Sequence, residues 1–313
     1  MLEKLVSRMT PKWRDTTVAL VFLSPFLAVY AVFLVYPIFY SMYLSFRTVS
    51  VDTDMFNVFS DMRFTGLKNY IELAKDYHFW WSLAVTFYYA ILYIPLLIFS
   101  SLVLAVLLNN HLKGHSFFRS AYFMPNVLDM FVVGTIWMFL YAPQGGVISQ
   151  IMNALGIDFF SREGILGSPR TAMLGVVVAL VLKNTGFGMI LFLAAIQNIS
   201  RSVYEAADID GASNWQKFTK ITIPLVRPII LFMVVTGMIG ALNSFTEIYA
   251  MTSGKPNVVV FGKTMEATRV AGYYLFRQWD RMNYGYAAAM SYALLFITLA
   301  VSYVNAKILK SSH

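Results

Sequence analysis

The sequence predicts an all-α integral membrane protein with six membrane-spanning helices. Of the 313 residues, 58% are hydrophobic and only 13% are charged, whereas a soluble domain carries about 25% charged residues. Six apolar runs each exceed the roughly 20 residues that a helix needs to cross a bilayer. Because backbone N–H and C=O groups in lipid must be satisfied within the protein, helices are the expected state of these runs.

The apolar runs divide the chain into a basic N-terminal tail (1–17), a six-span domain (18–306) and a short C-terminal tail (307–313). The expected spans are 18–46, 79–108, 121–142, 171–197, 228–251 and 284–306. Prolines interrupt several of them and are expected to break the first span at Pro25 and Pro37. The first run lacks a small-residue cleavage site, so it is interpreted as a retained span rather than a signal peptide.

Six spans place both termini on one side of the membrane. The segments on that side carry 12 Lys and Arg residues and the opposite segments carry 11, but the former are much shorter. The positive-inside rule acts on short segments, so the termini and the polar stretch 198–227 are expected to be cytoplasmic. The net charge of +8 is spread along the chain without a long basic run, which argues for contact with membrane lipid and against a nucleic-acid partner.

The composition also limits the chemistry. The chain has no cysteine, which excludes disulfides, thiol chemistry and Cys-based metal sites. His111 and His115 have the spacing of a metal pair, but Gly114 interrupts any helix there and no carboxylate is near, so no metal site is expected. The spans hold no His-Glu-x-x-His motif and no paired carboxylates, so no catalytic residue is assigned.

The polar segment 202–228 lies between the fourth and fifth runs and is predicted to form two short helices. Two residue pairs have the spacing of a capping box, which predicts a helix start at each: Ser202 with Glu205, and Ser213 with Gln216. Gly211 is expected to end the first helix and Pro224 the second. Trp215, Phe218 and Ile221 recur every three residues and give the second helix an apolar face that could pack against a partner.

This segment resembles the cytoplasmic loop signature of permease subunits of ATP-binding-cassette (ABC) importers. The residues that carry the resemblance are Glu205, Ala206, Ala207, Gly211, Ile221 and Pro224. Ile223 stands where leucine is usual. In that family the loop docks into a separate ATPase subunit, so the resemblance implies that these residues, with Trp215, couple the chain to an ATPase. The alternative is an ordinary amphipathic hairpin that links two spans.

Further motifs narrow the resemblance to permeases of carbohydrate importers, the type found in transporters for maltose, other oligosaccharides and glycerol phosphate. They are Ser24-Pro25, Tyr36-Pro37, Gly66-Leu67-Lys68-Asn69-Tyr70, Phe123-Met124-Pro125 and Gly285-Tyr286-Ala287-Ala288-Ala289. The resemblance implies a complex in a prokaryotic cytoplasmic membrane. It would contain a second, related permease, a dimer of ATP-binding subunits, and an extracytoplasmic solute-binding protein that delivers an oligosaccharide.

The chain itself has no Gly-x4-Gly-Lys-Ser/Thr phosphate loop, so ATP and Mg are expected on the partner ATPase subunits and no cofactor on this chain. Two other interpretations remain open: a permease of the same class for glycerol phosphate or another small polar solute, and a secondary transporter driven by an ion gradient. The latter would predict inverted halves with broken helices at matching positions, which the sequence does not display.

Polar residues in the fourth and fifth spans indicate a substrate pathway, because polar groups are costly in lipid and face a cavity or a partner helix. By resemblance these spans line the central sugar site. The candidates are Lys183, Asn184, Phe187, Gly188, Asn243, Ser244, Glu247 and Tyr249. Amides and hydroxyls suit sugar hydroxyls, and aromatic rings suit the apolar face of a pyranose. The alternative is that the small and polar residues only allow close helix packing.

Depth along the spans separates the two charged candidates, Lys183 and Glu247. Lys183 and Glu247 differ in depth by roughly 12 Å at helical rise, so an ion pair between them is not expected. Lys183 is expected to face the pathway and Glu247 the outer vestibule, whereas the role of Asp129 is left open. The outer segment 252–283 includes an aromatic helix that is expected either to lie in the membrane interface or to reach a docked binding protein.

Overall fold

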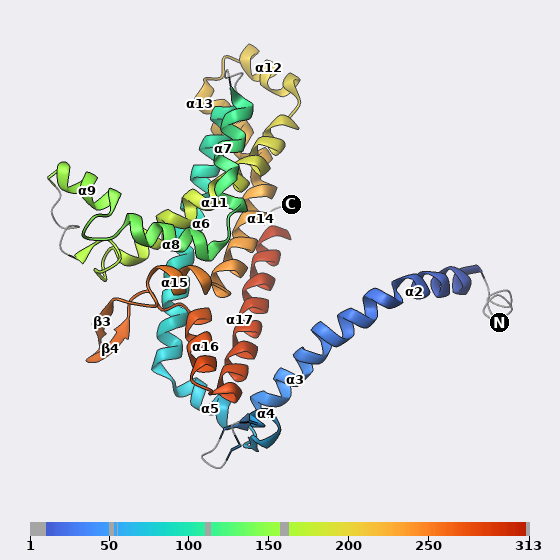
Figure 1. Ribbon diagram of the computed structural model, residues 1–313. Helices are drawn as coiled ribbons and strands as arrows, with labels where there is room; N and C mark the ends of the chain where they lie inside the picture. Colours follow the sequence, from blue (N-terminus) through green and yellow to red (C-terminus); the bar gives the residue numbers. More distant parts are fainter. Residues whose placement is uncertain (1–10, 50–52, 55, 110–113, 157–162, 311–313) are drawn as a thin grey trace. The chain divides into compact units, whose positions relative to one another are not determined.

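The structure is a computed structural model that describes residues 11–49, 53, 54, 56–109, 114–156 and 163–310 (Figure 1). The described residues do not include most of the N-terminal tail, the end of the C-terminal tail, or His111 of the pair His111 and His115. The chain divides into two compact units, Met1–Lys75 with Gln278–Tyr292, and Asp76–Arg277 with Ala293–His313. Helices dominate both, as predicted, and the described part also contains two antiparallel two-stranded sheets that the sequence analysis did not predict.

Five helices within the described residues are long and apolar enough to cross a membrane. They span Thr16–Ser45, Tyr77–Asn109, Ala172–Gln197, Asn214–Leu242 and Tyr284–Val304. A sixth span is counted only if helices α7 (His115–Val127) and α8 (Met130–Leu140) are taken together, and these are bent by 100°. The expected continuous third span over 121–142 is therefore wrong, and the total of six stays a prediction.

The break between α7 and α8 has a local cause in Asp129. Its carboxylate accepts hydrogen bonds from the backbone N–H groups of Phe131, at 2.8 Å, and Val132, at 3.4 Å. Asp129 is thus the N-cap of α8, while Leu128 before it is extended. A side-chain acceptor at this position satisfies amides that a new helix start leaves unpaired. This contact gives Asp129 the role that its sequence position left open.

The first unit begins with one long helix made of α2 (Pro11–Tyr30), the π-helical stretch η1 (Ala31–Val35) and α3 (Tyr36–Ser45). Its apolar side chains are exposed along most of its length, as expected for a helix that faces lipid or another chain. Strands β1 (Arg47–Thr48) and β2 (Arg63–Phe64) pair antiparallel around α4 (Val58–Asp61), and α5 (Lys68–Lys75) follows.

Residues of the short motifs meet at the end of α3. The Asn69 amide donates to the carbonyl oxygens of Ser45, at 2.8 Å, and Arg47, at 2.9 Å. The Tyr70 hydroxyl donates to the Ser45 hydroxyl at 2.8 Å. A Cβ on Gly285 would lie 1.7 Å from the Arg47 carbonyl oxygen, so only glycine fits there. These residues therefore help to satisfy backbone carbonyl groups where the chain leaves the first helix.

Prolines do not end the helices as predicted. The residue before Pro37, Tyr36, donates its N–H to the Ala31 carbonyl, five residues back. The residue before Pro224, Ile223, likewise donates to Phe218 across the stretch η2 (Phe218–Thr222). Each π-helical stretch accommodates a proline that lacks an N–H and would crowd the carbonyl four residues earlier. Both helices therefore continue through their prolines.

The second unit is built on α6 (Tyr77–Asn109), α11 (Ala172–Gln197) and α14 (Ile223–Leu242), with α7 against α11 (Figure 1). Buried Val176, Met189 and Phe192 of α11 belong to its core. The predicted fifth span over 228–251 is wrong at both ends. The helix begins before Pro228, stops at Leu242, and a short helix α15 (Thr246–Met251) follows the break.

The remaining elements connect or follow these helices. The helix α9 (Val147–Ala154) follows α8, and α12 (Arg201–Ile209) and α13 (Asn214–Lys217) follow α11. Strands β3 (Asn257–Val260) and β4 (Lys263–Glu266) form a hairpin before α16 (Ala271–Asp280), and α17 (Tyr284–Lys310) ends the described chain. Both α16 and α17 have residues in each unit. In Figure 1, α12 and α13 lie at one end of the long helices and the β3–β4 hairpin lies toward the other.

A buried polar network holds the β3–β4 hairpin and α16 to the start of α6. Glu266 accepts from Arg269 at 3.0 Å and from Arg277, and the Trp81 indole donates to the Glu266 carbonyl at 2.9 Å. Burial lowers the pKa of Arg269, and the adjacent Glu266 carboxylate opposes that shift. Tyr273 and Tyr274 of α16 are buried here, so their rings pack within the protein.

Candidate functional site

At the centre of the loop 198–227, helix α12 ends in a hydrogen-bonded C-terminal cap. Gly211 lies at φ +75°. Its N–H donates to the Asp208 carbonyl at 3.1 Å, and the N–H of Ala212 donates to the Ala207 carbonyl at 2.9 Å. This pair of bonds is a Schellman motif, which requires a left-handed residue just past the helix. The four-residue separation of Ala207 and Gly211 in the signature is therefore the spacing of this motif.

The second capping box is confirmed and the first is wrong. The Gln216 N–H donates to the Ser213 hydroxyl, and the Ser213 N–H donates to the Gln216 side chain at 2.8 Å. At the first helix, Ser200 is the N-cap and no side chain caps it. Glu205 instead pairs with Arg201 at 3.0 Å on an exposed surface. The prediction failed because the helix already begins at Arg201, before the serine that the spacing implied as its cap.

Two contacts fix α12 against the helix that follows it. The Lys217 amine lies 2.6 Å from the Asp208 carboxylate, and Lys217 is mostly buried. The Tyr204 and Thr222 hydroxyls lie 2.9 Å apart. Pro224 stands at the start of α14 with its helix continuous from Asn214. The loop is thus cross-linked internally and joined directly to a long helix.

The outer surface of this loop carries apolar side chains. Ile209 is 87% exposed and Trp215 is 70% exposed. Phe218 packs on the core of the second unit, and Ile221 is half-buried. Of the predicted apolar face, Trp215 is therefore the member that is free to meet another protein. Glu205 and Ala206 are exposed, whereas Ala207 is buried.

A cavity of about 440 Å³ lies where α14 breaks. Residues of α6, α8, α11, α14 and α15 surround it, and they are Tyr89, Tyr93, Leu97, Met130, Leu180, Asn184, Phe187, Phe232, Met233, Thr236, Gly237, Gly240, Ala241, Asn243, Ser244, Phe245, Thr246 and Glu247. Five of the eight predicted pathway residues are in this set. Its size falls within the range of small-ligand sites.

The polar groups of the cavity come from α6, α11, α14 and α15. The Asn184 amide donates to the Tyr93 hydroxyl at 2.8 Å, and the Tyr89 and Tyr93 rings stack with centroids 5.4 Å apart. Ser244 donates to the carboxylate of Glu247, which is only 8% exposed. Asn243 caps the end of α14. Glu247 therefore shares one cavity with Asn184, and its expected position near the outer vestibule stays a prediction.

Lys183 and Asn184 are neighbours in sequence but face different surroundings. The Lys183 amine donates to the Asn126 carbonyl at 3.2 Å, and the Asn126 amide donates to the Asn184 side chain at 3.2 Å. Lys183 is not among the residues around the cavity. It holds a carbonyl at the C-terminal end of α7, where a positive charge is favourable. No described contact joins it to Glu247, as expected; its assignment to the pathway stays a prediction.

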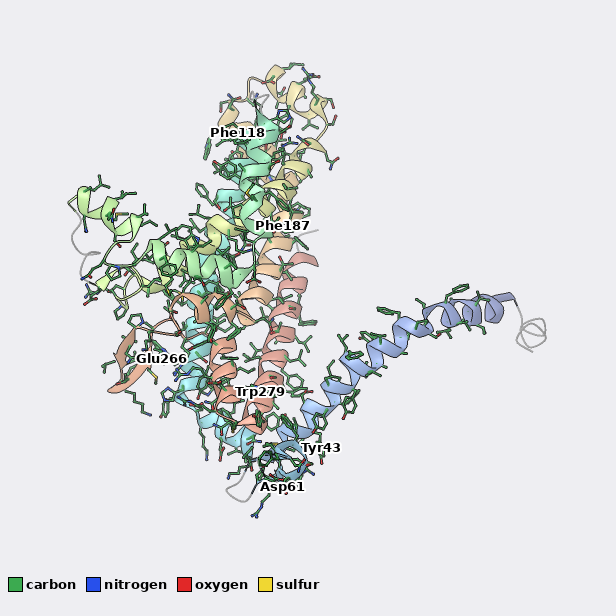
Figure 2. The ribbon with its side chains drawn as sticks, viewed as in Figure 1. Tyr43, Asp61, Phe118, Phe187, Glu266 and Trp279 are labelled. Carbon is green, nitrogen blue, oxygen red and sulfur yellow. The ribbon has the colours of Figure 1, made fainter. Side chains whose placement is uncertain are left out.

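The other two pathway candidates lie beside the cavity rather than on its wall. A Cβ on Gly188 would lie 2.3 Å from the Ser101 hydroxyl and 2.7 Å from the Met233 methyl, so Gly188 permits close packing of α11 with α6 and α14. Tyr249 belongs to an aromatic group with Phe131, Phe245 and Phe276. Phe187, labelled in Figure 2, projects from α11 and is on the wall.

Sequence reasoning missed the contribution of α6. Tyr89 and Tyr93 are four residues apart, which places both on one helix face, and this spacing was the available signal. Asn126 was also missed, because it lies inside the expected third span, 121–142. Among the described residues, no group of three or more His, Asp or Glu side chains is arranged to bind a metal.

Helices long and apolar enough to cross a membrane, a cavity at a helix break and the polar loop 198–227 are the features expected of a membrane transport subunit. Residues 73–308 match the family described as the binding-protein-dependent transport system inner membrane component. The chain therefore belongs to this family, and the resemblance drawn from the loop signature is confirmed.

Named relatives extend the match over nearly the whole chain. The probable ABC transporter permease protein YurN of Bacillus subtilis is 34% identical over 93% of this chain and 95% of its own length. The lactose transport system permease protein LacF of Rhizobium radiobacter is 32% identical over 91% of both chains. A chain of a bacterial ABC transporter that imports the acidic polysaccharide alginate is similar in fold, with a TM-score of 0.77 at 19% identity, over 96% of this chain and 99% of that chain.

Proposed function

We propose that this chain is the permease subunit of an ATP-driven importer and forms, with a second related permease, the pathway for an oligosaccharide. The observation that carries the proposal is the cavity at the break of α14. Its amide, hydroxyl and carboxylate groups suit sugar hydroxyls, and its tyrosine and phenylalanine rings suit pyranose faces. Relatives such as the lactose system permease support a carbohydrate solute.

The loop 198–227 is the proposed contact with a dimer of ATP-binding subunits. Its exposed Ile209 and Trp215 are apolar side chains on a polar loop, and buried apolar anchors dominate the energy of protein interfaces. ATP and Mg would be bound by those partner subunits, and this chain would perform no catalysis of its own. In this arrangement the loop, the termini and the ATPase lie on the cytoplasmic side of a prokaryotic inner membrane, with six spans.

The β3–β4 hairpin is the proposed contact with an extracytoplasmic solute-binding protein. Its two-residue turn holds Phe261 at φ +50° and Gly262 at φ +74°. Both residues are left-handed, as in a type I′ turn, and phenylalanine is an unfavourable residue there. Phe261 is fully exposed. An unfavourable conformation that displays a large apolar ring supports a binding role for the hairpin tip.

The test is to purify the complex that this chain forms in its host membrane and to identify its other chains. The complex is then placed in vesicles with its binding protein, and ATPase activity is measured with neutral and acidic oligosaccharides of two to five units. We expect ATP-binding chains, a second permease, and stimulation by a carbohydrate. Transport by the purified chain alone, without nucleotide, would refute the proposal.

Variants on α11 connect the cavity to the measured transport. Asn184→Ala removes a cavity amide and its bond to Tyr93, and we expect a several-fold loss of apparent solute affinity. The matched control is Leu182→Ala on the same helix, since Leu182 is exposed and does not contribute to the cavity. Equal effects of the two substitutions would count against the cavity as the solute site.

A further inference from the structure

The charge on the wall of the cavity at the break of α14 is negative. Of its described wall residues, Glu247 is the single charged side chain, and lysine, arginine and histidine are absent from this set. The carboxylate is almost fully buried and accepts a hydrogen bond from Ser244. It shares the cavity wall with Tyr89 and Tyr93. The negative charge therefore acts on the space that a solute would occupy.

Lys183, the cation next in sequence to the cavity residue Asn184, is directed elsewhere. The Lys183 amine bonds the Asn126 carbonyl at the end of α7 and interacts with the Asp129 carboxylate. Both partners belong to the break between α7 and α8 and lie outside the cavity wall. Lys183 is thus engaged with the structure of α7, and the next residue, Asn184, contributes a neutral amide to the cavity.

A buried carboxylate discriminates strongly between solutes of different charge. A sugar hydroxyl can donate a hydrogen bond to Glu247, and hydrogen bonds to charged groups are stronger than neutral ones. A uronate or a phosphate would instead bring a second negative charge into a partly buried site, where like charges repel with little screening. The stacked rings of Tyr89 and Tyr93 favour a neutral pyranose face in the same space.

We propose that this cavity excludes anionic solutes and that the transported carbohydrate is uncharged, with Glu247 as the residue that selects by charge. The identity of the solute as a carbohydrate rests on the proposed function, whereas the charge selection rests on the cavity alone. On this basis the solute differs in charge from that of the similar alginate importer, which is named for an acidic polysaccharide.

The test uses a thiol placed in the cavity of the intact complex. The chain has no cysteine, so Thr236→Cys gives one reporter on the cavity wall of this chain. A cationic and an anionic methanethiosulfonate of similar size, carrying trimethylammonium or sulfonate, are reacted with it. The rate on this chain is followed by mass spectrometry. Asn153→Cys is the reference site, because Asn153 is exposed on α9, whose sequence has no charged residue.

We expect the ratio of cationic to anionic rates at residue 236 to exceed the ratio at residue 153 by about fivefold or more. In the Glu247→Gln background the two ratios should become similar, whereas Glu247→Asp should keep most of the preference. Asp retains the charge, so it separates loss of charge from loss of folding. An anionic reagent that reacts as fast as the cationic one in the native cavity overturns the proposal, as does a ratio that Gln leaves unchanged.

The solute is tested separately with the complex and its binding protein. Neutral oligosaccharides should stimulate ATPase activity, and oligouronates of the same length should not. Strongest stimulation by an oligouronate would overturn the charge selection but leave the carbohydrate permease intact. If no carbohydrate stimulates the complex while the thiol rates still depend on Glu247, the proposed function fails and the negative cavity stands.

Discussion

Replacement of Gly211 by alanine tests whether the loop 198–227 must keep its helix terminus for transport. Gly211 lies at φ +75°, and nothing lies within 4 Å of the position that a Cβ would take. The substitution therefore introduces no clash. Its cost comes only from placing an L-residue in the left-handed region, which is about 1–2 kcal/mol for alanine. Asparagine tolerates this region better, and a β-branched residue such as valine tolerates it worse.

A cost of this size is large for so short an element. Helix α12 has 9 residues, and isolated helices of this length are marginal without caps and packing. A change of about 1–2 kcal/mol alters a local equilibrium roughly 5- to 30-fold. We therefore expect the fraction of complexes with an ordered loop end to fall in the order Gly, Asn, Ala, Val at position 211.

The assay is solute uptake per ATP hydrolysed by the reconstituted complex, measured beside thermal unfolding. Gly156 provides the matched control. It follows α9 at φ +77° with nothing within 4 Å of its Cβ position, and its N–H bonds the Asn153 carbonyl at 2.9 Å. Gly156→Ala should therefore lower stability by a similar amount. We expect uptake per ATP to fall several-fold in Gly211→Ala and to stay unchanged in Gly156→Ala.

Two results would refute this reasoning. If Asn, Ala and Val at position 211 reduced coupling equally, backbone conformation would not be the cause. If Gly156→Ala reduced uptake per ATP as much as Gly211→Ala, a general loss of stability would account for both effects, and the loop would have no special part in coupling.

Three further substitutions have defined outcomes. Asp208→Asn removes the ion pair with mostly buried Lys217 and should lower uptake per ATP, whereas Glu72→Gln, in an exposed pair with Lys68, should have no effect; equal effects contradict the argument. Gly186→Ala would place a Cβ 2.0 Å from the Tyr122 carbonyl oxygen and should destabilise the protein by about 1–3 kcal/mol. Gly240→Ala, where the Cβ position is open, should have a much smaller effect. Equal unfolding temperatures of the two variants would contradict the argument. Lys183→Met should lower the unfolding temperature through loss of the Asn126 bond, and an unchanged unfolding temperature contradicts the argument; a change in solute affinity would support the predicted place of Lys183 in the pathway.

The long apolar helices could be predicted from sequence because their cause is local. The second and fourth runs were expected over 79–108 and 171–197, and the helices occupy Tyr77–Asn109 and Ala172–Gln197. Hydrophobic length alone sets such segments. The Gly211 terminus was also predictable, because a glycine that directly follows a short polar helix commonly ends it in the left-handed conformation.

Helix ends inside apolar runs were harder to predict, because the amino-acid composition does not change at these positions. Pro224 and Pro37 looked like stops, but bonding to the carbonyl five residues back carries each helix past its proline. At Asp129 the signal was present, as a cap residue before Met130, yet the apolar residues on both sides hid it. The break at Asn243 has no comparable local signal that we can identify.

The site depended on these breaks and was therefore only partly predictable. From the sequence alone, Asn184 and Lys183 are equally good candidates for the substrate pathway. They differ because α7 ends at Val127 and offers the Asn126 carbonyl to the lysine. With a continuous third span that carbonyl would bond within its own helix, and the lysine would need another partner. The environment of Lys183 was thus fixed by Asp129, a capping residue far from it in sequence.

The wrong prediction at Pro224 matters most for how the loop and the cavity are connected. Because the helix does not stop there, one continuous element runs from Asn214 to Leu242, a length of roughly 43 Å at helical rise. Trp215 lies at one end of this element on the exposed loop, and Asn243 lies at the other on the cavity wall. A displacement of the loop therefore reaches the cavity along one continuous helix. Had Pro224 ended the helix, the same displacement could be absorbed by the turn between them.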